Sequence, residues 1–482
     1  MAEPTDILSL TATDLSRRIA ARDVSCSALM QASLARIGTL NPQFNAIVSL
    51  RDAGALMDEA RQRDDELAQG RRRGWMHGFP IAVKDLSDAQ GLPTTLGSAA
   101  IGMRPATADA LFVQRMKAAG AIVIGKTNTP EFGLGSHTYN KVFGTTRNAY
   151  DPSRTAGGSS GGAAVALALR MLPVADGSDM GGSLRNPAAF NNVVGFRPSR
   201  GRVPAVPAED AFFQQLGTEG PMGRSVEDVA RLLSTMSGWD ARAPLSLTDR
   251  LPDADAPDPI ATLHGKRIGW LGSIWPDLPL EPGILPLCER ALQQLADHGC
   301  VVEPCTLAFS RERNWSAWLR LRQLLVGGKL GGLYADPHKR GLLKPEAIWE
   351  IEQSQALTAA QLYQASANRT ALYHALRQLF ERYDYLVAPT AQVFPFDATQ
   401  AWPRQVGAVA MDTYHRWMEI VTPFTLAGLP VVSMPVGFNS GGLPMGMQIV
   451  GPAHADLQVL ALARAFESLT QWTDRNPPTV LA

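Results

Sequence analysis

The chain has 482 residues, of which 45% are apolar, and its 45 basic side chains balance its 45 acidic ones. This length suits about three domains of ~150 residues or one large α/β domain, with ample apolar side chains for a core. The zero net charge argues against nucleic acid or an anionic membrane surface as the main partner.

The cysteines, the N-terminus and the apolar runs bear on localisation. Four scattered cysteines without a CxxC pair are typical of free thiols in a reducing compartment. The N-terminal MAEPTDILSL lacks the basic and apolar regions of a signal peptide. The apolar run 163–169 stops at Arg170, far short of the ~20 residues of a membrane span. We therefore expect a cytoplasmic protein.

The first half of the chain alternates predicted helices and strands. Apolar spacing predicts two short amphipathic helices in 12–38, a charged helix in 52–73, and helices over 108–119 and 160–170. Short apolar runs predict strands over 44–50, 78–86 and 121–128, and residues 129–158 form a long loop rich in glycine, threonine, asparagine and proline. This alternation indicates an α/β class with a buried sheet.

The second half continues the same pattern. Residues 240–262, rich in aspartate and proline, predict a surface segment, and 311–381 a largely helical one containing a capping box from Thr358 to Gln361. Other predicted helices cover 283–298 and 454–468, and predicted strands cover 266–272, 300–304 and 383–390. Two final apolar runs, 429–438 and 444–451, predict a closing strand pair.

Residues 155–187 hold two serine sites flanked by glycine, GGSSGG at 157–162 and GGS at 181–183. Glycine lets backbone N–H groups approach a ligand closely. Serine beside such loops is either a local structural residue or a nucleophile: Ser159 as a helix N-cap, Ser183 as a turn residue, or both in catalysis. Lys84, at the end of a predicted strand, is likewise either a surface lysine or a base.

Several long motifs resemble those of the amidase signature family of serine hydrolases. They are GFPIAVKDL (78–86), GKTNTPEFGLGS (125–136), RTAGGSSGGAAVALA (154–168), SDMGGSLRNPAAFNNVVGFRPSRGRVP (178–204), FTLAGLPVVSMPVGF (424–438) and GLPMGMQIVG (442–451). The resemblance implies one α/β/α domain over 1–482 around a mixed, mostly parallel sheet. Its core signature would span 78–205, and a variable helical segment would lie at about 310–381 within the same domain.

The resemblance also implies a Ser–Ser–Lys triad. Ser183 matches the nucleophile, Ser159 the bridging serine that the family holds through a cis peptide bond, and Lys84 the general base. The backbone N–H groups of Met180, Gly181, Gly182 and Ser183 would form the oxyanion hole. Met180 stands where relatives often carry Thr or Ile, and Ala163 where others carry Ser or Glu; neither departure removes a group that the chemistry needs.

The physical chemistry of these residue types agrees with that assignment. A serine hydroxyl needs an adjacent base to become a nucleophile. Lysine, with an unperturbed pKa of ~10.4, can be that base only when burial lowers its pKa. Asp179 and Arg185 flank Ser183, and we expect them to support it, with a plain surface ion pair as the alternative.

Other classes of protein fit less well. Gly157–Gly161 matches the GxSxG motif of α/β-hydrolases, but the preceding RNAYDPSRTA is not the apolar strand which that motif needs. The histidines show no HExxH spacing, and a phosphate-binding GxxxxGK[ST] loop is absent. A non-catalytic binding protein would not need all of Lys84, Ser159 and Ser183. The remaining alternative is the amidase subunit of a tRNA-dependent amidotransferase, which frees ammonia from glutamine.

The expected activity is hydrolysis of the C–N bond of small amides through an acyl-enzyme, without a cofactor or metal. Anilides, primary amides and aryl carbamates are compatible substrates, as are some esters. Four aromatic residues of the helical segment are candidates for either core packing or an apolar substrate pocket: Trp315, Trp318, Tyr334 and Trp349. The resemblance leaves a homodimer open.

Overall fold

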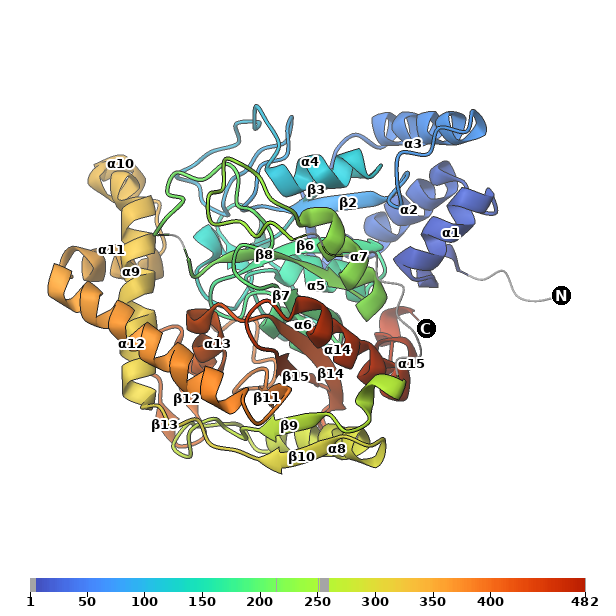
Figure 1. The fold of residues 1–482 in the computed structure, drawn as a ribbon. Coiled ribbons are helices and arrows are strands. Elements are labelled where there is room, and N and C mark those ends of the chain that lie inside the picture. Colours follow the sequence, from blue (N-terminus) through green and yellow to red (C-terminus); the bar gives the residue numbers. More distant parts are fainter. Residues whose placement is uncertain (1–5, 214, 250, 252–259, 482) are drawn as a thin grey trace.

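The computed structural model describes residues 6–213, 215–249, 251 and 260–481. A mixed sheet of eight strands forms its centre, and helices flank that sheet (Figure 1). In spatial order the strands are β10 (Val301–Pro304), β9 (Arg267–Trp270), β11 (Tyr385–Pro389), β15 (Pro444–Val450), β14 (Val431–Phe438), β7 (Val194–Arg197), β8 (Thr218–Gly223) and β6 (Val174–Asp179). The predicted α/β class is confirmed.

A second, three-stranded sheet carries the lysine motif. Its order is β1 (Ile47–Val48), β3 (Ile122–Thr127) and β2 (Pro80–Lys84). Two short ribbons pair β4 (Tyr139–Asn140) with β5 (Gly144–Thr145), and β12 (Gln405–Val406) with β13 (Val409–Ala410). The N–H of Lys84 donates to the carboxylate of Asp176 in β6 at 3.2 Å, which ties the small sheet to the edge of the large one.

The expectation of a mostly parallel sheet is wrong. Within the described part of the large sheet, β10–β9 and β9–β11 are parallel, and the five other neighbouring pairs are antiparallel. One connection explains part of this. Residues 439–443 join β14 to β15 as a hairpin, which is too short for parallel neighbours, because these need a crossover of about a dozen residues or more.

The predicted helices are present with shifted ends. Four further helices in the described part of the chain were not predicted: Arg185–Phe190, Val226–Met236, Thr422–Ala427 and Trp472–Arg475. The first group is α1 (Ala12–Ala21), α2 (Cys26–Phe44), α3 (Ala53–Ala68), α4 (Leu111–Ala118), α5 (Gly161–Ala168), α6 (Arg185–Phe190) and α7 (Val226–Met236). The second is α8 (Ile284–Asp297), α9 (Arg311–Ala335), α10 (Pro337–Arg340), α11 (Pro345–Gln355), α12 (Ala359–Leu379), α13 (Thr422–Ala427), α14 (Asp456–Thr470) and α15 (Trp472–Arg475). Among the described residues, no helix is long and apolar enough to cross a membrane.

The predicted helical segment 311–381 corresponds to α9–α12, which gather at one side of the molecule in Figure 1. The capping box is present: the Thr358 hydroxyl accepts from the N–H of Gln361, whose side chain accepts from the Thr358 N–H at 2.9 Å. The predicted surface segment 240–262 lies partly outside the described residues.

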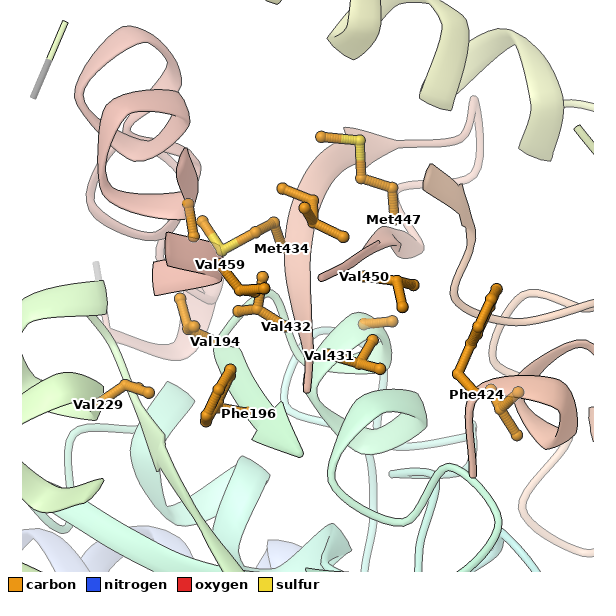
Figure 2. Packing of buried hydrophobic residues seen from close by; sticks show 14 of the residues in the cluster. Val194, Phe196, Val229, Phe424, Val431, Val432, Met434, Met447, Val450 and Val459 are labelled. Atoms are coloured by element: carbon orange, nitrogen blue, oxygen red, sulfur yellow. The ribbon is translucent and has the colours of Figure 1, made fainter. Parts of the chain in front are cut away.

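A large apolar cluster packs the main sheet against several of its helices. Figure 2 shows part of it, with labelled side chains from β7, β14, β15, α7, α13 and α14: Val194, Phe196, Val229, Phe424, Val431, Val432, Met434, Met447, Val450 and Val459. Full burial of one such aliphatic or aromatic side chain is worth about 1.5–3 kcal/mol. The same core contains residues of β6 and β2, the strands that end at Asp179 and Lys84.

Gly195 in β7 allows the turn after Ser183 to pack directly on the sheet. A Cβ at this position would clash with the carbonyl oxygen of Leu184 and lie 2.8 Å from Cβ of Ala188 in α6. Backbone cannot move aside as a flexible side chain can. We therefore expect Gly195→Ala to lower the free energy of unfolding by about 1–3 kcal/mol, measured by urea denaturation.

Gly332→Ala in α9 is the matched control. A Cβ there meets nothing within 4 Å, so the same substitution removes a helix-interior glycine and is expected to stabilise the protein by about 0.5–1 kcal/mol. Equal effects of the two substitutions would contradict the close packing at Gly195.

Candidate active site

Three segments bring the predicted catalytic residues together. Lys84 is the last residue of β2, Ser159 lies in the loop before α5, and Ser183 lies in the turn between β6 and α6. The N–H of Ser160 donates to the carbonyl oxygen of Ser183 at 3.2 Å, which joins the two glycine-serine segments directly. The peptide bond between Gly158 and Ser159 is cis, as the resemblance implies.

The Lys84 amine lies among serine hydroxyls. Its Nζ is 2.7 Å from Oγ of Ser159, 2.8 Å from Oγ of Ser160 and 2.9 Å from Oγ of Ser178. The Lys84 side chain is completely buried, so the surface-lysine alternative is wrong. Ser160, not Ser159, is the residue that precedes α5 as its N-cap, so the N-cap interpretation of Ser159 is wrong as well.

Burial is also the main influence on the Lys84 pKa. It lowers this pKa from 10.5 to about 8, although Glu219, Asp176 and Asp179 each act to raise it. The hydroxyls around Nζ carry no charge, so they solvate the amine without a contact ion pair that would hold it protonated. A pKa near neutrality is what a lysine base requires.

Asp179 and Arg185 form part of a buried ionic network. Arg185 donates to both carboxylate oxygens of Asp179, at 2.9 and 3.0 Å, and Arg197 lies 3.3 Å from the same carboxylate. All three side chains are fully buried, so the surface ion-pair alternative is wrong. Burial raises the Asp179 pKa, but the two arginine charges outweigh it and hold the pKa well below its ordinary value.

The Asp179 carboxylate also shapes the loop that follows it. Oδ1 accepts from the N–H of Gly182 at 2.9 Å, and Oδ2 accepts from the N–H of Leu184 at 3.1 Å. Gly182 has a φ of 88°, a left-handed conformation that favours glycine. These contacts hold the backbone on both sides of Ser183.

The Gly182 N–H was expected to point into the oxyanion hole. In this structure it donates instead to the Asp179 carboxylate. Among the described residues, the N–H groups of Met180, Gly181 and Ser183 have no hydrogen-bond partner. These three remain the candidates for binding a developing oxyanion.

Helix α9 covers this loop. The indole Nε1 of Trp318 donates to the carbonyl oxygen of Met180 at 3.3 Å, and its ring would lie 3.0 Å from a Cβ at Gly181. Arg322, one turn further on, is 3.5 Å from the Met180 sulfur and donates to Glu350 at 2.7 Å. The helical segment thus supplies a wall beside the predicted nucleophile.

The four aromatic candidates for a pocket have different surroundings. Trp318 contacts the Met180–Gly181 backbone, and the Trp315 ring stacks on the Trp318 ring with centroids 5.1 Å apart. Trp349 packs edge-on against Tyr414 and His415. The Tyr334 hydroxyl donates to Glu352, and its ring lies under Arg340.

The serine–lysine cluster contains residues that the sequence analysis did not assign to the site. Ser160 and Ser178 complete the shell around Nζ, and Asp176 binds the Lys84 backbone. Burial raises the Asp176 pKa to about 6. The only sequence signal for Ser160, Ser178 and Asp176 was that they lie near the motif serines along the chain. Their contact with Lys84 depends on how β2 lies against β6. Within the described residues, no group of three His, Cys, Asp or Glu side chains is arranged to hold a metal ion.

Comparisons with known proteins agree with this geometry. The chain is 35% identical to a glutamyl-tRNA(Gln) amidotransferase subunit of Symbiobacterium thermophilum, covering 97% of this chain and 98% of the relative. It is 31% identical to an acylamidase of Rhodococcus erythropolis, covering 97% of each. A solved bacterial aryl acylamidase of the amidase signature family superposes with a TM-score of 0.89 at 28% identity, covering 98% of both chains.

A family model described as Amidase matches residues 28–460. The match extends over nearly the whole chain, in agreement with the motifs and with the structural neighbours. The chain belongs to the amidase signature family and is a hydrolase that acts on carbon–nitrogen bonds.

Proposed function

We propose that this protein is a stand-alone serine amidohydrolase that cleaves small amides through an acyl-enzyme on Ser183. The observation that carries the proposal is the 2.7 Å contact between Lys84 Nζ and Ser159 Oγ. The buried Lys84 amine, whose pKa is lowered, thus lies against Ser159, and the adjacent Ser160 binds the Ser183 backbone. The α/β-hydrolase alternative would require a histidine in the place of Lys84.

Burial separates the three groups by access. Lys84 is 0% exposed, Ser159 2% and Ser183 8%. Ser183 is thus the most accessible of the three, as a nucleophile must be, while the base is shielded from water. A neutral lysine has two N–H donors and one lone pair, so Ser160 and Ser178 can accept while Ser159 donates to Nζ.

The proposed reaction follows from that arrangement. Ser183 Oγ attacks the amide carbonyl carbon, and its proton passes through the Ser159 hydroxyl to Lys84 Nζ. The intermediate collapses by breaking the C–N bond, and the same proton passes to the leaving nitrogen. Water then attacks the acyl-enzyme, giving the carboxylic acid and free Ser183.

The N–H groups of Met180, Gly181 and Ser183 are proposed to stabilise the oxyanion of each tetrahedral intermediate. Losing one donor of this kind typically costs about 2.7–4 kcal/mol of transition-state stabilisation. Asp179 supports them indirectly, because its bonds to Gly182 and Leu184 hold the loop on which they lie.

We propose small neutral or aromatic amides, including anilides, primary amides and aryl carbamates, as the substrate class. The likeness to proteins named acylamidase and aryl acylamidase supports this class. Some esters should react by the same steps.

A second candidate is the amidase subunit of a tRNA-dependent amidotransferase, favoured by the 35% identity to a subunit of such an enzyme. A protein of this kind would work with partner chains and release ammonia from glutamine. Affinity purification from the native host, combined with a glutaminase assay, separates the two candidates. Stable partner chains together with glutamine-dependent ammonia release would favour the amidotransferase, and anilide hydrolysis by the purified chain alone would favour the stand-alone enzyme.

The lowered pKa of Lys84 predicts an alkaline rise in activity. The neutral amine is the active form, and its fraction grows as the pH passes through the pKa, so the acylation rate should increase from neutral pH with a midpoint near pH 8. Single-turnover hydrolysis of an aryl ester or anilide measures this step directly. A flat profile from about pH 5 to 9 would contradict a lysine base.

The nucleophile can be identified by covalent labelling. A fluorophosphonate probe followed by peptide mapping should label Ser183 in the wild-type protein and leave Ser183→Ala unlabelled. Amide hydrolysis should fall by about 10³-fold or more in that variant, as in other enzymes that lose a nucleophile. Labelling of Ser159 instead would overturn the assignment, and thermal unfolding of both proteins checks that the variant is folded.

A further inference from the structure

One carboxylate beside the catalytic lysine has no role in the mechanism above. Glu219 in β8 lies directly opposite Ser178 of β6 in the antiparallel register. Directly opposed residues project from the same face of a sheet and are close neighbours. Because the Ser178 hydroxyl is 2.9 Å from Lys84 Nζ, the Glu219 side chain leaves the sheet on the side of the active site.

Solvent reaches the sheet at this pair of residues. Within β6, Ser178 is the one partly exposed residue, and within β8 it is Glu219; the other residues of both strands are buried. The neighbouring Met180 is partly exposed as well. Ser178, Met180 and Glu219 are therefore partly exposed on the side of Ser183 from which we expect a substrate to enter.

One oxygen of the Glu219 carboxylate is unpartnered in the part of the chain that the structure describes. This oxygen, Oε2, is buried and has no hydrogen-bond partner among the described residues. Lys84, the nearest catalytic cation, is already surrounded by three hydroxyls. A buried acceptor without a partner is costly, so this oxygen is suited to a donor that arrives with a ligand.

The charges around Glu219 are few. Burial is the main reason that the pKa of Glu219 is raised to about 7; Lys84 and Lys329 act to lower this pKa, and Asp176 acts to raise it. Lys329 is an exposed residue of α9, so it remains free to move in solvent. Above neutral pH, where the lysine base is active, Glu219 is ionised and accepts hydrogen bonds only.

We propose that Glu219 is a specificity-determining residue that faces the substrate and, among the aromatic amides proposed above, favours those carrying an ammonium or another strong N–H donor near the scissile bond. The inference rests on the proposed function for the identity of the bond cleaved. An anionic substituent at the same place would meet a like charge and be disfavoured.

Equilibrium binding to Ser183→Ala, which cannot turn the ligands over, tests this selectivity. Two matched pairs differ mainly in charge: β-alanyl and butyryl para-nitroanilide on the acyl side, and para-(aminomethyl)acetanilide and para-ethylacetanilide on the leaving side. At a pH near 8, calorimetry should show tighter binding of the cationic member in at least one pair. Adding Glu219→Gln should remove that advantage, a change of about tenfold in the Kd ratio.

The control is the same chemical change at a distant site. Glu289→Gln in α8, at an exposed carboxylate, should leave the Kd ratio of the cationic to the neutral ligand unchanged. A cationic advantage that survives Glu219→Gln, or the absence of any such advantage in Ser183→Ala, would overturn the inference. Hydrolysis of the neutral ligands by the wild-type protein is measured in parallel, so failure of the proposed amidase activity is seen separately from failure of the charge selectivity.

Discussion

The active site depends on one buried amine that is solvated by hydroxyl groups. Moving an ammonium group out of water is expensive, and a nearby opposite charge would offset that cost only by keeping the amine protonated. The shell of Ser159, Ser160 and Ser178 around Lys84 offers hydrogen bonds without a contact ion pair. This choice of neighbours lets the amine exist as a base near neutral pH.

Asp179, a second buried ionisable group near Ser183, has the opposite kind of surroundings. Asp179 is surrounded by Arg185 and Arg197, which keep it ionised despite complete burial. As a carboxylate it accepts from the backbone on both sides of Ser183 and holds that turn rigid. Asp179 thus keeps its charge and holds the turn, whereas Lys84 loses its charge more readily, as the proposed base must.

The proposed reacting groups and the residues that surround them come from different parts of the chain. The glycine-serine segments and the end of β2 supply the proposed reacting groups, whereas the residues around them come from other elements. Trp318 of α9 covers the Met180–Gly181 backbone, and Glu219 of β8 is partly exposed opposite Ser178.

The sequence by itself determined the α/β class and most helices and strands, because apolar spacing is a local signal. Its motifs, which are local too, determined the family of the chain and singled out Lys84, Ser159 and Ser183. Apolar runs report burial and not strand direction, so the largely antiparallel order of the main sheet depended on which strands pair across long distances. For the same reason only the tertiary structure placed Ser178 and Asp176 against Lys84, turned the Gly182 N–H toward Asp179, and set Glu219 opposite Ser178. Each of those contacts joins different strands or turns, and their relative positions come from packing of the whole core.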